Sequence, residues 1–406
     1  MENSCNDRNG CFIFSDLILL GGVLRDEGVS AFANAVLNDD VGSYAKACSV
    51  LLEKDAFTQF GDYVENVIRT DDNLFARRAF KGTLTEGIVK AYSHDLRVLQ
   101  NLCTKTVSLP NKITAAICDG FPEIECGNGS FVSSSIDEIL RDLTAFYTKN
   151  GFGIFIENKA FTYENGALCP VRNACSVLLS DLKDYTEEKN AVQNNIQSFL
   201  QGLPFSNMLL YGDKGTGKSS TIHAMLNEYA AAGLRAVEVT KERIADVNAI
   251  KSLLTDLPFK FLIFIDDLSL EEHDEKVTTL KAALEGSLNA KGNNVMIVAT
   301  SNRRHILKEN FSDRENSVHA RDTMEEQLSL SDRFGLSICF SSTGKTEYLS
   351  IVRQLADDVQ LNCDETRLFA LAERWAIVKG GRSPRRAKQF VDYLHACSVK
   401  GIEADF

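Results

Sequence analysis

The sequence contains no Cys-x-x-Cys pair, and its cysteines follow no regular spacing. There are 11 of them, an odd number, scattered over 406 residues. We therefore expect neither a disulfide framework nor a structural zinc site, but reduced thiols in a cytoplasmic protein. Positive charge is also scarce: 44 Lys and Arg stand against 56 Asp and Glu, a net charge of −12. This balance argues against a broad nucleic-acid-binding surface, although it is compatible with a local basic patch.

A membrane segment is also missing. The apolar run at residues 12–24 is too short to span a bilayer. Asp16 interrupts this run, acidic residues precede it as well as Arg8, and it lacks a small-residue cleavage site, so it is not a typical signal peptide. The sequence predicts a core helix there and no membrane partner. Internal repeats, heptads and low-complexity tracts are absent too, and the apolar fraction of 44% is that of an ordinary globular protein.

The strongest signal present is the segment at residues 212–219, which matches the phosphate-binding loop G-x-x-x-x-G-K-[ST]. An apolar strand is predicted before it and a helix after it. Glycines in this setting let backbone N–H groups cradle phosphate oxygens at a helix N-terminus. Lys218 would reach the β- and γ-phosphates, and the Ser219 hydroxyl would hold Mg²⁺. A chance match in a glycine-rich turn is the alternative, and Lys-Ser at the correct offset argues against it. The predicted nucleotide-binding residues of the loop are Gly212, Asp213, Lys214, Gly215, Thr216, Gly217, Lys218, Ser219 and Ser220.

A second signal is the apolar strand at residues 261–265, which ends in Asp266 and Asp267. Adjacent carboxylates at the end of a buried strand repel each other and lose hydration. A Mg²⁺ ion held by Asp266, with Asp267 left to orient or deprotonate water, would account for both acids. An exposed turn is the alternative, because Asp is common in turns. The phosphate loop upstream favours the metal site.

Three more polar residues are candidates. Asn302 follows the apolar run at residues 295–299 and could bond the attacking water or the γ-phosphate. Arg333 precedes the last predicted strand, and Arg385 opens a helix in the tail. A guanidinium at the γ-phosphate stabilises transition-state charge and is worth roughly 10³–10⁵ in rate. The alternatives are a polar turn for Asn302 and surface ion pairs for the two arginines.

The apolar runs predict an α/β fold with a five-stranded parallel sheet covered by helices. The predicted strands lie at residues 207–211, 235–239, 261–265, 295–299 and 336–340. Residues 1–150 are predicted to be mainly helical. The segments 152–156 and 160–163 are predicted to be a hairpin or paired strands, and the tail carries amphipathic helices.

The order of these motifs resembles that of the AAA+ P-loop ATPases over roughly residues 180–406. Within that superfamily the match narrows to a bacterial family of predicted AAA+ ATPases of unknown function. The segments of this chain that resemble the family include 210–221, 264–269, 299–305 and 328–335, with residues 94–99 in the N-terminal region. The resemblance implies Walker A at residues 212–219, Walker B at Asp266 and Asp267, and sensor 1 at Asn302. It also implies a trans-acting arginine finger at Arg333 and a sensor 2 at Arg385 on a helical lid.

The same resemblance implies ATP and Mg²⁺ as cofactors and a homo-oligomer. Tyr185, with Asp184, sits where the superfamily usually contacts adenine, and no Asn-Lys-x-Asp motif points to guanine. The chain departs from the family pattern at Asp267, where Walker B usually carries glutamate, as in some replication initiators and helicase loaders. We therefore expect slow or partner-stimulated hydrolysis.

Four domains are expected. They are a helical N-terminal domain at residues 1–150, a β-hairpin-like linker segment at 151–180, a nucleotide-binding α/β domain at 181–345 and a helical lid at 346–406.

Three functions remain open at this point. The first is an ATP-hydrolysing AAA+ switch or remodeller of an unknown protein client. The second is a helicase-loader-like ATPase associated with nucleic acid, for which the basic runs 303–305 and 379–388 argue and the acidic net charge does not. The third is a binding module gated by nucleotide without hydrolysis, which the short side chain of Asp267 favours. A small-molecule kinase would share the loop, but no acceptor site is recognisable.

Overall fold

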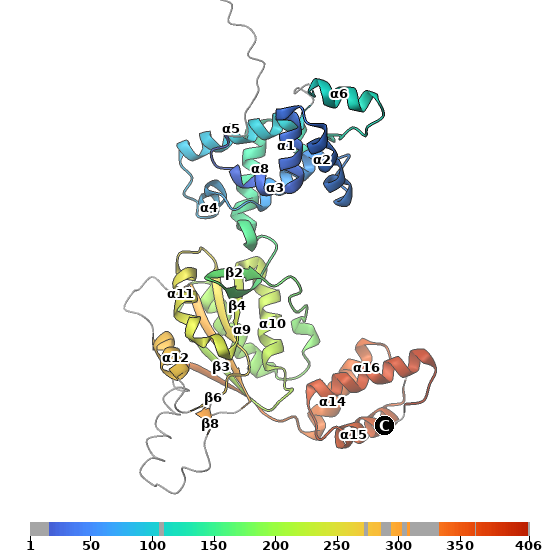
Figure 1. Cartoon of the computed structure of the whole chain (residues 1–406). Coiled ribbons are helices and arrows are strands. Elements are labelled where there is room, and N and C mark those ends of the chain that lie inside the picture. The colour runs from blue at the N-terminus through green and yellow to red at the C-terminus, as the bar shows by residue number, and fades with distance from the viewer. Residues whose placement is uncertain are drawn as a thin grey trace, which may run out of the picture. The chain divides into compact units, whose positions relative to one another are not determined.

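The computed structural model describes residues 16–104, 109–271, 275–285, 294–302, 307–308, 333–361 and 363–404. The chain divides into two compact units, residues 1–157 and 158–406 (Figure 1). Residues 12–15 of the core helix predicted at 12–24 lie outside the described residues, as do residues 303–305 and 328–332. The described remainder of that run forms the 3-10 turn η2 (Gly21–Arg25) and no α-helix, so the helix prediction is wrong there.

The first unit is helical in all its described elements, as predicted. The α-helices are α1 (Glu27–Asn38), α2 (Val41–Glu53), α3 (Phe60–Thr70), α4 (Leu74–Phe80), α5 (Glu86–Cys103), α6 (Asn111–Cys118), α7 (Ser130–Ser133) and α8 (Ile136–Asn150). Two 3-10 turns, η2 (Gly21–Arg25) and η3 (Gly153–Phe155), flank them. The strand predicted at residues 152–156 is therefore wrong. Gly151 and Gly153 have φ of 88° and 53°, which interrupts an extended backbone at this apolar run.

Buried aromatic rings join the longer helices of this unit. Phe75 of α4 stacks on Tyr92 of α5, with ring centroids 3.8 Å apart. The hydroxyl of Tyr147, on α8, donates a hydrogen bond to the carbonyl of Ile68 at 2.8 Å. Asp95 of α5 is fully buried and accepts backbone N–H bonds from residues 18–20. The start of the described chain is thereby tied to α5.

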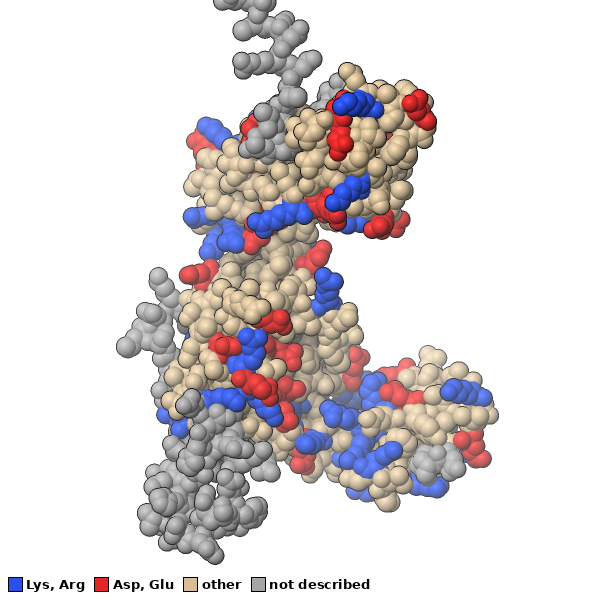
Figure 2. Space-filling view, in the orientation of Figure 1, with Lys and Arg blue, Asp and Glu red and all other residues tan. Residues whose placement is uncertain are grey.

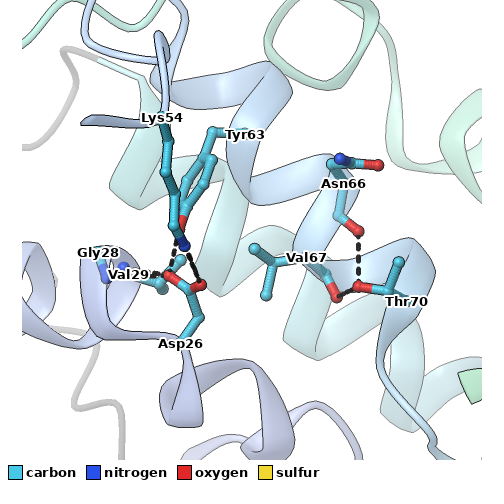
Figure 3. A network of polar contacts seen from close by, with 8 residues as sticks. All are labelled: Asp26, Gly28, Val29, Lys54, Tyr63, Asn66, Val67 and Thr70. Atoms are coloured by element: carbon cyan, nitrogen blue, oxygen red, sulfur yellow. Dashed lines mark hydrogen bonds and ion pairs between the residues drawn. The ribbon is translucent and has the colours of Figure 1, made fainter. Parts of the chain in front are cut away.

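A polar network centred on Asp26 ties α1, α2 and α3 together (Figure 3). Asp26 caps α1, and its carboxylate accepts the backbone N–H groups of Gly28 and Val29 at 2.9 and 3.0 Å. It also accepts the Tyr63 hydroxyl at 2.7 Å and lies 3.1 Å from Nζ of Lys54. Burial alone would raise the pKa of Asp26, but the hydrogen bonds from Tyr63, Val29 and Lys54 outweigh it and leave that pKa below its ordinary value. Burial, together with Asp26, raises the pKa of Tyr63 to about 12.

The second unit contains a seven-stranded sheet in the order β2-β1-β4-β5-β7-β3-β9. Its strands are β1 (Ala160–Glu164), β2 (Ala167–Pro170), β3 (Met208–Gly212), β4 (Leu234–Val239), β5 (Lys260–Ile265), β7 (Val295–Ser301) and β9 (Leu336–Phe340). All neighbours are parallel except β1 and β2. The five predicted parallel strands are confirmed. Two short strands, β6 (Leu270–Glu271) and β8 (Leu307–Lys308), pair separately.

The two additional strands are a hairpin that the sequence placed in a linker. β1 and β2 turn at Asn165 and Gly166, which have φ of 49° and 85°. Positive φ at both turn residues is the geometry that Asn-Gly favours in a two-residue hairpin. β1 also pairs in parallel with β4, so the hairpin extends the sheet.

Helices cover both faces of the sheet, as its continuous apolar strands require. They are α9 (Thr186–Leu200), α10 (Lys218–Tyr229), α11 (Val247–Thr255) and α12 (Glu275–Glu285), with short 3-10 turns η4 (Leu179–Asp181), η5 (Ala230–Ala232) and η6 (Lys241–Asp246). Ile196 of α9 and Met225 of α10 share one apolar cluster with strand residues such as Leu210 and Val298. α11 packs against β7 and α12.

Three helices follow the sheet and form the predicted lid: α14 (Lys345–Asp358), α15 (Glu365–Val378) and α16 (Pro384–Lys400). They share an apolar core that includes Tyr348, Trp375 and Phe390. Ser383 caps α16 and Pro384 is its first residue, a strong helix start. Among the helices of the described residues, none is long and apolar enough to cross a membrane.

Candidate nucleotide-binding site

The phosphate loop joins β3 to α10 through residues with left-handed backbone. Gly212, Gly215 and Gly217 have φ of 133°, 79° and 97°. A Cβ at Gly212 would lie 2.0 Å from the carbonyl oxygen of Phe340, so only glycine allows β3 and β9 to approach here. α10 begins at Lys218, and N–H groups of a first helical turn have no partner within the helix. Together the loop and helix end have the geometry that suits an anion.

Lys218 lies beneath this loop with only 6% of its surface exposed. Its Nζ donates to the carbonyl oxygens of Gly212 at 2.9 Å and Asp213 at 2.7 Å, and to Oδ1 of Asn302 at 3.4 Å. Burial lowers the pKa of Lys218, and the nearby carboxylates of Asp213, Asp267 and Asp266 oppose this shift. A partly desolvated ammonium with these neutral acceptors would gain energy from an anionic phosphate.

The Ser219 hydroxyl and the Asp266 carboxylate meet at the mouth of the loop. Oγ of Ser219 lies 2.5 Å from Oδ1 of Asp266, so β5 and the first turn of α10 present two oxygen ligands at one point. Mg²⁺ prefers oxygen ligands and takes only one or two carboxylates when phosphates complete its shell. These residues fit such an ion. Over the residues that the structure covers, no cluster of three or more His, Cys, Asp or Glu suggests a metal site held by protein ligands alone.

Asp267 and Asn302 lie together at the carboxyl ends of neighbouring strands. β5 and β7 are parallel neighbours, so the residues after their carboxyl ends lie side by side. The Nδ2 group of Asn302 donates to Oδ1 of Asp267, whose own φ is 50°.

The lid supplies the opposite wall of a cleft of about 590 Å³. Arg385 and Lys388 of α16 line it, and the backbone N–H of Arg385 donates to the carbonyl of Gly215 at 3.2 Å. Figure 2 shows that Lys and Arg side chains gather on this lid. Residues 214–220 of the loop also line the cleft, whereas Gly212 and Asp213 lie behind it and present their carbonyls to Lys218.

One end of the cleft is built around Tyr185. Asp184 and Tyr185 both have left-handed backbone, with φ of 67° and 55°. The Tyr185 hydroxyl donates to the carbonyl of Ser341 at 2.6 Å, and burial raises its pKa. The cleft residues that were not predicted include Lys189 of α9, and Ile351 and Leu355 of α14. No motif marks them, because apolar and basic residues on amphipathic helices are ordinary.

Arg333 does not line the cleft. It precedes β9, whose Leu336 pairs with Met208 and whose Phe340 pairs with Gly212. The loop lies at the far end of that strand, roughly 13 Å beyond Leu336 at the usual rise per residue. Within one chain, Arg333 therefore adjoins the amino-terminal end of β9, whereas the loop follows the carboxyl-terminal end of the neighbouring strand β3.

Residues 156–398 match the model of a family described as "Protein of unknown function (DUF815)". The match takes in the β1–β2 hairpin, the sheet and most of the lid. This chain belongs to that family.

Part of this chain is also similar in sequence to an AAA+ protein. The chain is 33% identical over 117 residues to "AAA-ATPase At2g46620" of Arabidopsis thaliana. That match covers 26% of this chain and 22% of the plant protein, about a fifth of its length. It confirms the predicted resemblance to AAA+ P-loop ATPases.

Solved structures with a similar arrangement include several of RuvB from Thermotoga maritima. One of them, a single-residue variant, has a TM-score of 0.40 and 15% identity, and the match covers 56% of this chain and 67% of that one. Another, titled a RuvB Holliday junction branch migration motor, has a TM-score of 0.38 and 16% identity, with the same coverage.

Proposed function

We propose that this protein binds ATP with Mg²⁺ and hydrolyses it slowly, as a switch or remodeller of a protein client. The observation that carries this proposal is the convergence of Lys218, Ser219, Asp266, Asp267 and Asn302 on one cleft. They come from β3–α10, β5 and β7, which are far apart in the sequence. The parallel sheet brings the carboxyl ends of these strands together.

Each group has a distinct role in this proposal. The loop N–H groups and Lys218 hold the β- and γ-phosphates. Ser219 and Asp266 would hold Mg²⁺, which supplies neutralisation of the phosphate charge. Asp267 accepts a proton from the attacking water, whose oxygen bonds the γ-phosphorus as the bond to the β-phosphate oxygen breaks. Arg385 reaches the γ-phosphate from the lid and stabilises the charge that develops on it.

Slow turnover follows from the contacts of Asp267. Aspartate is one methylene shorter than glutamate, and the amide of Asn302 occupies one of its carboxylate oxygens. A γ-phosphate that competes for this amide would release Asp267 to orient water. The rate of hydrolysis then depends on how far the bound γ-phosphate displaces the Asn302 amide from Asp267.

Arg333 is proposed to act on the nucleotide of a neighbouring copy. Its place at the strand end opposite its own loop supports this assignment, since an arginine there would reach a phosphate only in another subunit. An active homo-oligomer follows. The nine described cysteines are free thiols, which favours the cytoplasm as the proposed location.

Subunit mixing tests hydrolysis and trans action together. Lys218→Ala removes the phosphate contact, and Arg333→Ala removes the finger, so each variant alone should lose ATPase activity. In a mixture, the intact cleft of an Arg333→Ala subunit can receive Arg333 from a Lys218→Ala neighbour. Activity should therefore return on mixing, and wild-type activity per molecule should rise with protein concentration.

Arg353→Ala is the matched control, because Arg353 is a lid arginine that pairs with Glu365 on the surface. It should hydrolyse ATP like the wild type. If the two inactive variants stay inactive when mixed, trans action by Arg333 is excluded. The proposal that the wild-type protein hydrolyses ATP is not affected by that outcome. Wild-type activity that survives Lys218→Ala would exclude this cleft as the site.

A second candidate function is a binding module gated by nucleotide without hydrolysis, which the bond between Asn302 and Asp267 favours. It requires tight ATP binding with no phosphate release at any protein concentration. Steady phosphate release that disappears in Lys218→Ala protein eliminates it. Nucleic-acid binding is the less favoured alternative, and it requires salt-sensitive DNA binding in the presence of ATP.

A further inference from the structure

Thr300 of β7 contacts both carboxylate residues from the neighbouring strand. Its hydroxyl donates to Oδ1 of Asp266 at 2.5 Å and accepts the backbone N–H of Asp267 at 3.0 Å. Its carbonyl oxygen accepts the N–H of Leu268 at 2.7 Å. One residue, 2% exposed, therefore bonds three consecutive residues at the end of β5.

The direction of these bonds is fixed by chemistry. A hydroxyl has one proton, and a backbone N–H can only donate, so the Thr300 proton must go to Asp266 while its lone pair takes the N–H of Asp267. Ser219 reaches the same Oδ1 of Asp266 at 2.5 Å. A cation held by Ser219 and Asp266 would require the Ser219 oxygen to turn a lone pair toward the ion. Thr300 needs no such change and would remain an outer partner of the metal ligand.

The same hydroxyl holds the turn that aims Asp267. Asp267 has a φ of 50°, a left-handed conformation that is unfavourable for a residue with a Cβ. The N–H of Asp267 donates to the Thr300 hydroxyl and the N–H of Leu268 donates to the Thr300 carbonyl, and both bonds stabilise this turn. This turn places the Asp267 carboxylate where it accepts the hydrogen bond from Asn302.

We infer that Thr300 is a positioning residue that sets the affinity of this site for Mg²⁺ and the orientation of both carboxylates. The inference rests on the proposed nucleotide site and adds a determinant that no motif marks. Outer partners of metal ligands typically change metal affinity about 10- to 100-fold when they are removed. Loss of the Thr300 hydroxyl should raise the Mg²⁺ concentration that the site requires and leave metal-free nucleotide affinity unchanged.

Two variants separate the hydroxyl from the shape of the side chain. Thr300→Val keeps the branched shape without the hydroxyl, and Thr300→Ser keeps the hydroxyl. The affinity of each protein for a fluorescent ATP analogue is measured in EDTA and then across a Mg²⁺ titration. This readout needs no hydrolysis.

Thr300→Val should bind the analogue in EDTA within about twofold of wild type but require about 10- to 100-fold more Mg²⁺ for the metal-dependent gain. Thr300→Ser should stay within about threefold of wild type throughout. An unchanged Mg²⁺ requirement in Thr300→Val would overturn the inference, as would an equal loss of affinity in EDTA and in Mg²⁺. Wild-type protein that binds the analogue under neither condition would instead overturn the proposed nucleotide site itself.

Discussion

The backbone N–H of Arg385 donates a hydrogen bond to the carbonyl oxygen of Gly215 at 3.2 Å. The lid therefore touches the phosphate loop through the main chain. A Cβ at Gly215 would lie 3.1 Å from Oγ of Ser383 and 3.2 Å from Cβ of Arg385, so the two segments are already in van der Waals contact. This contact carries the Arg385 side chain to the cleft.

Arg385→Ala is expected to lower the rate of ATP hydrolysis by about 10²-fold, because it removes one donor to the developing phosphate charge. Nucleotide affinity should fall much less, since the loop and Lys218 remain. Arg386→Ala is the matched control, because the neighbouring arginine does not line the cleft. Steady-state kinetics on both variants check the prediction, and equal losses in the two would contradict a specific role for Arg385.

Nucleotide affinity is expected to decline on the alkaline side at a lower pH than an ordinary lysine would produce. Burial lowers the pKa of Lys218, so its charge is fully present only below that lowered pKa and disappears as pH rises through it. A bound phosphate favours the charged form, so binding in this range should take up protons. Calorimetry in two buffers of different ionisation enthalpy measures that uptake. Lys218→Arg should abolish the uptake because arginine does not titrate there, and net proton release by the wild type would refute the prediction.

Asp26→Asn is expected to destabilise the helical unit by about 1–2 kcal/mol at neutral pH, since it weakens a helix cap and a charged hydrogen-bond network. The pKa of Asp26 is lowered in the folded protein. Its contribution is therefore present above the pKa of an unfolded aspartate and is lost as pH falls through the folded value. Urea denaturation followed by circular dichroism at several pH values tests this.

Asp40→Asn is the control for Asp26, because Asp40 caps α2 on the exposed surface through Gly42 and Ser43. It should cost less, because water competes for its hydrogen bonds. The bonds from Ser43 and Gly42 lower the pKa of Asp40 too, so its contribution is likewise lost at low pH. A pH-independent loss in Asp26→Asn would show that charge is not what Asp26 contributes.

Gly212→Ala is expected to cost about 3 kcal/mol or more in stability and to abolish nucleotide binding, because the added Cβ meets the Phe340 carbonyl at 2.0 Å in a strained backbone. Gly217→Ala is a contrasting variant, since nothing lies within 4 Å of its added Cβ. Only the left-handed φ should then cost energy, about 1–2 kcal/mol. Thermal denaturation compares the two, and similar losses would contradict the close approach of β3 and β9.

Local pattern predicted the central strands well because they are buried on both faces. The five apolar runs and the loop needed no tertiary information. The pairing of β1 with β4 could not be read from the sequence, since nothing in residues 160–164 specifies a parallel partner 76 residues away. The same limit applies to the site. Lys218, Asp266 and Asn302 belong to motifs, whereas Thr300 gains its importance only from the strand beside it.

Residues 341–344 are all that separates the edge strand β9 from the first lid helix, α14. Four residues span at most about 13–14 Å when fully extended. The helical lid is therefore tethered closely to the strand whose Phe340 carbonyl accepts the N–H of Asp213. The Tyr185 hydroxyl also binds this tether, at the carbonyl of Ser341. Any opening of the cleft must consequently be a swing about this anchor, with a travel limited by the length of the tether.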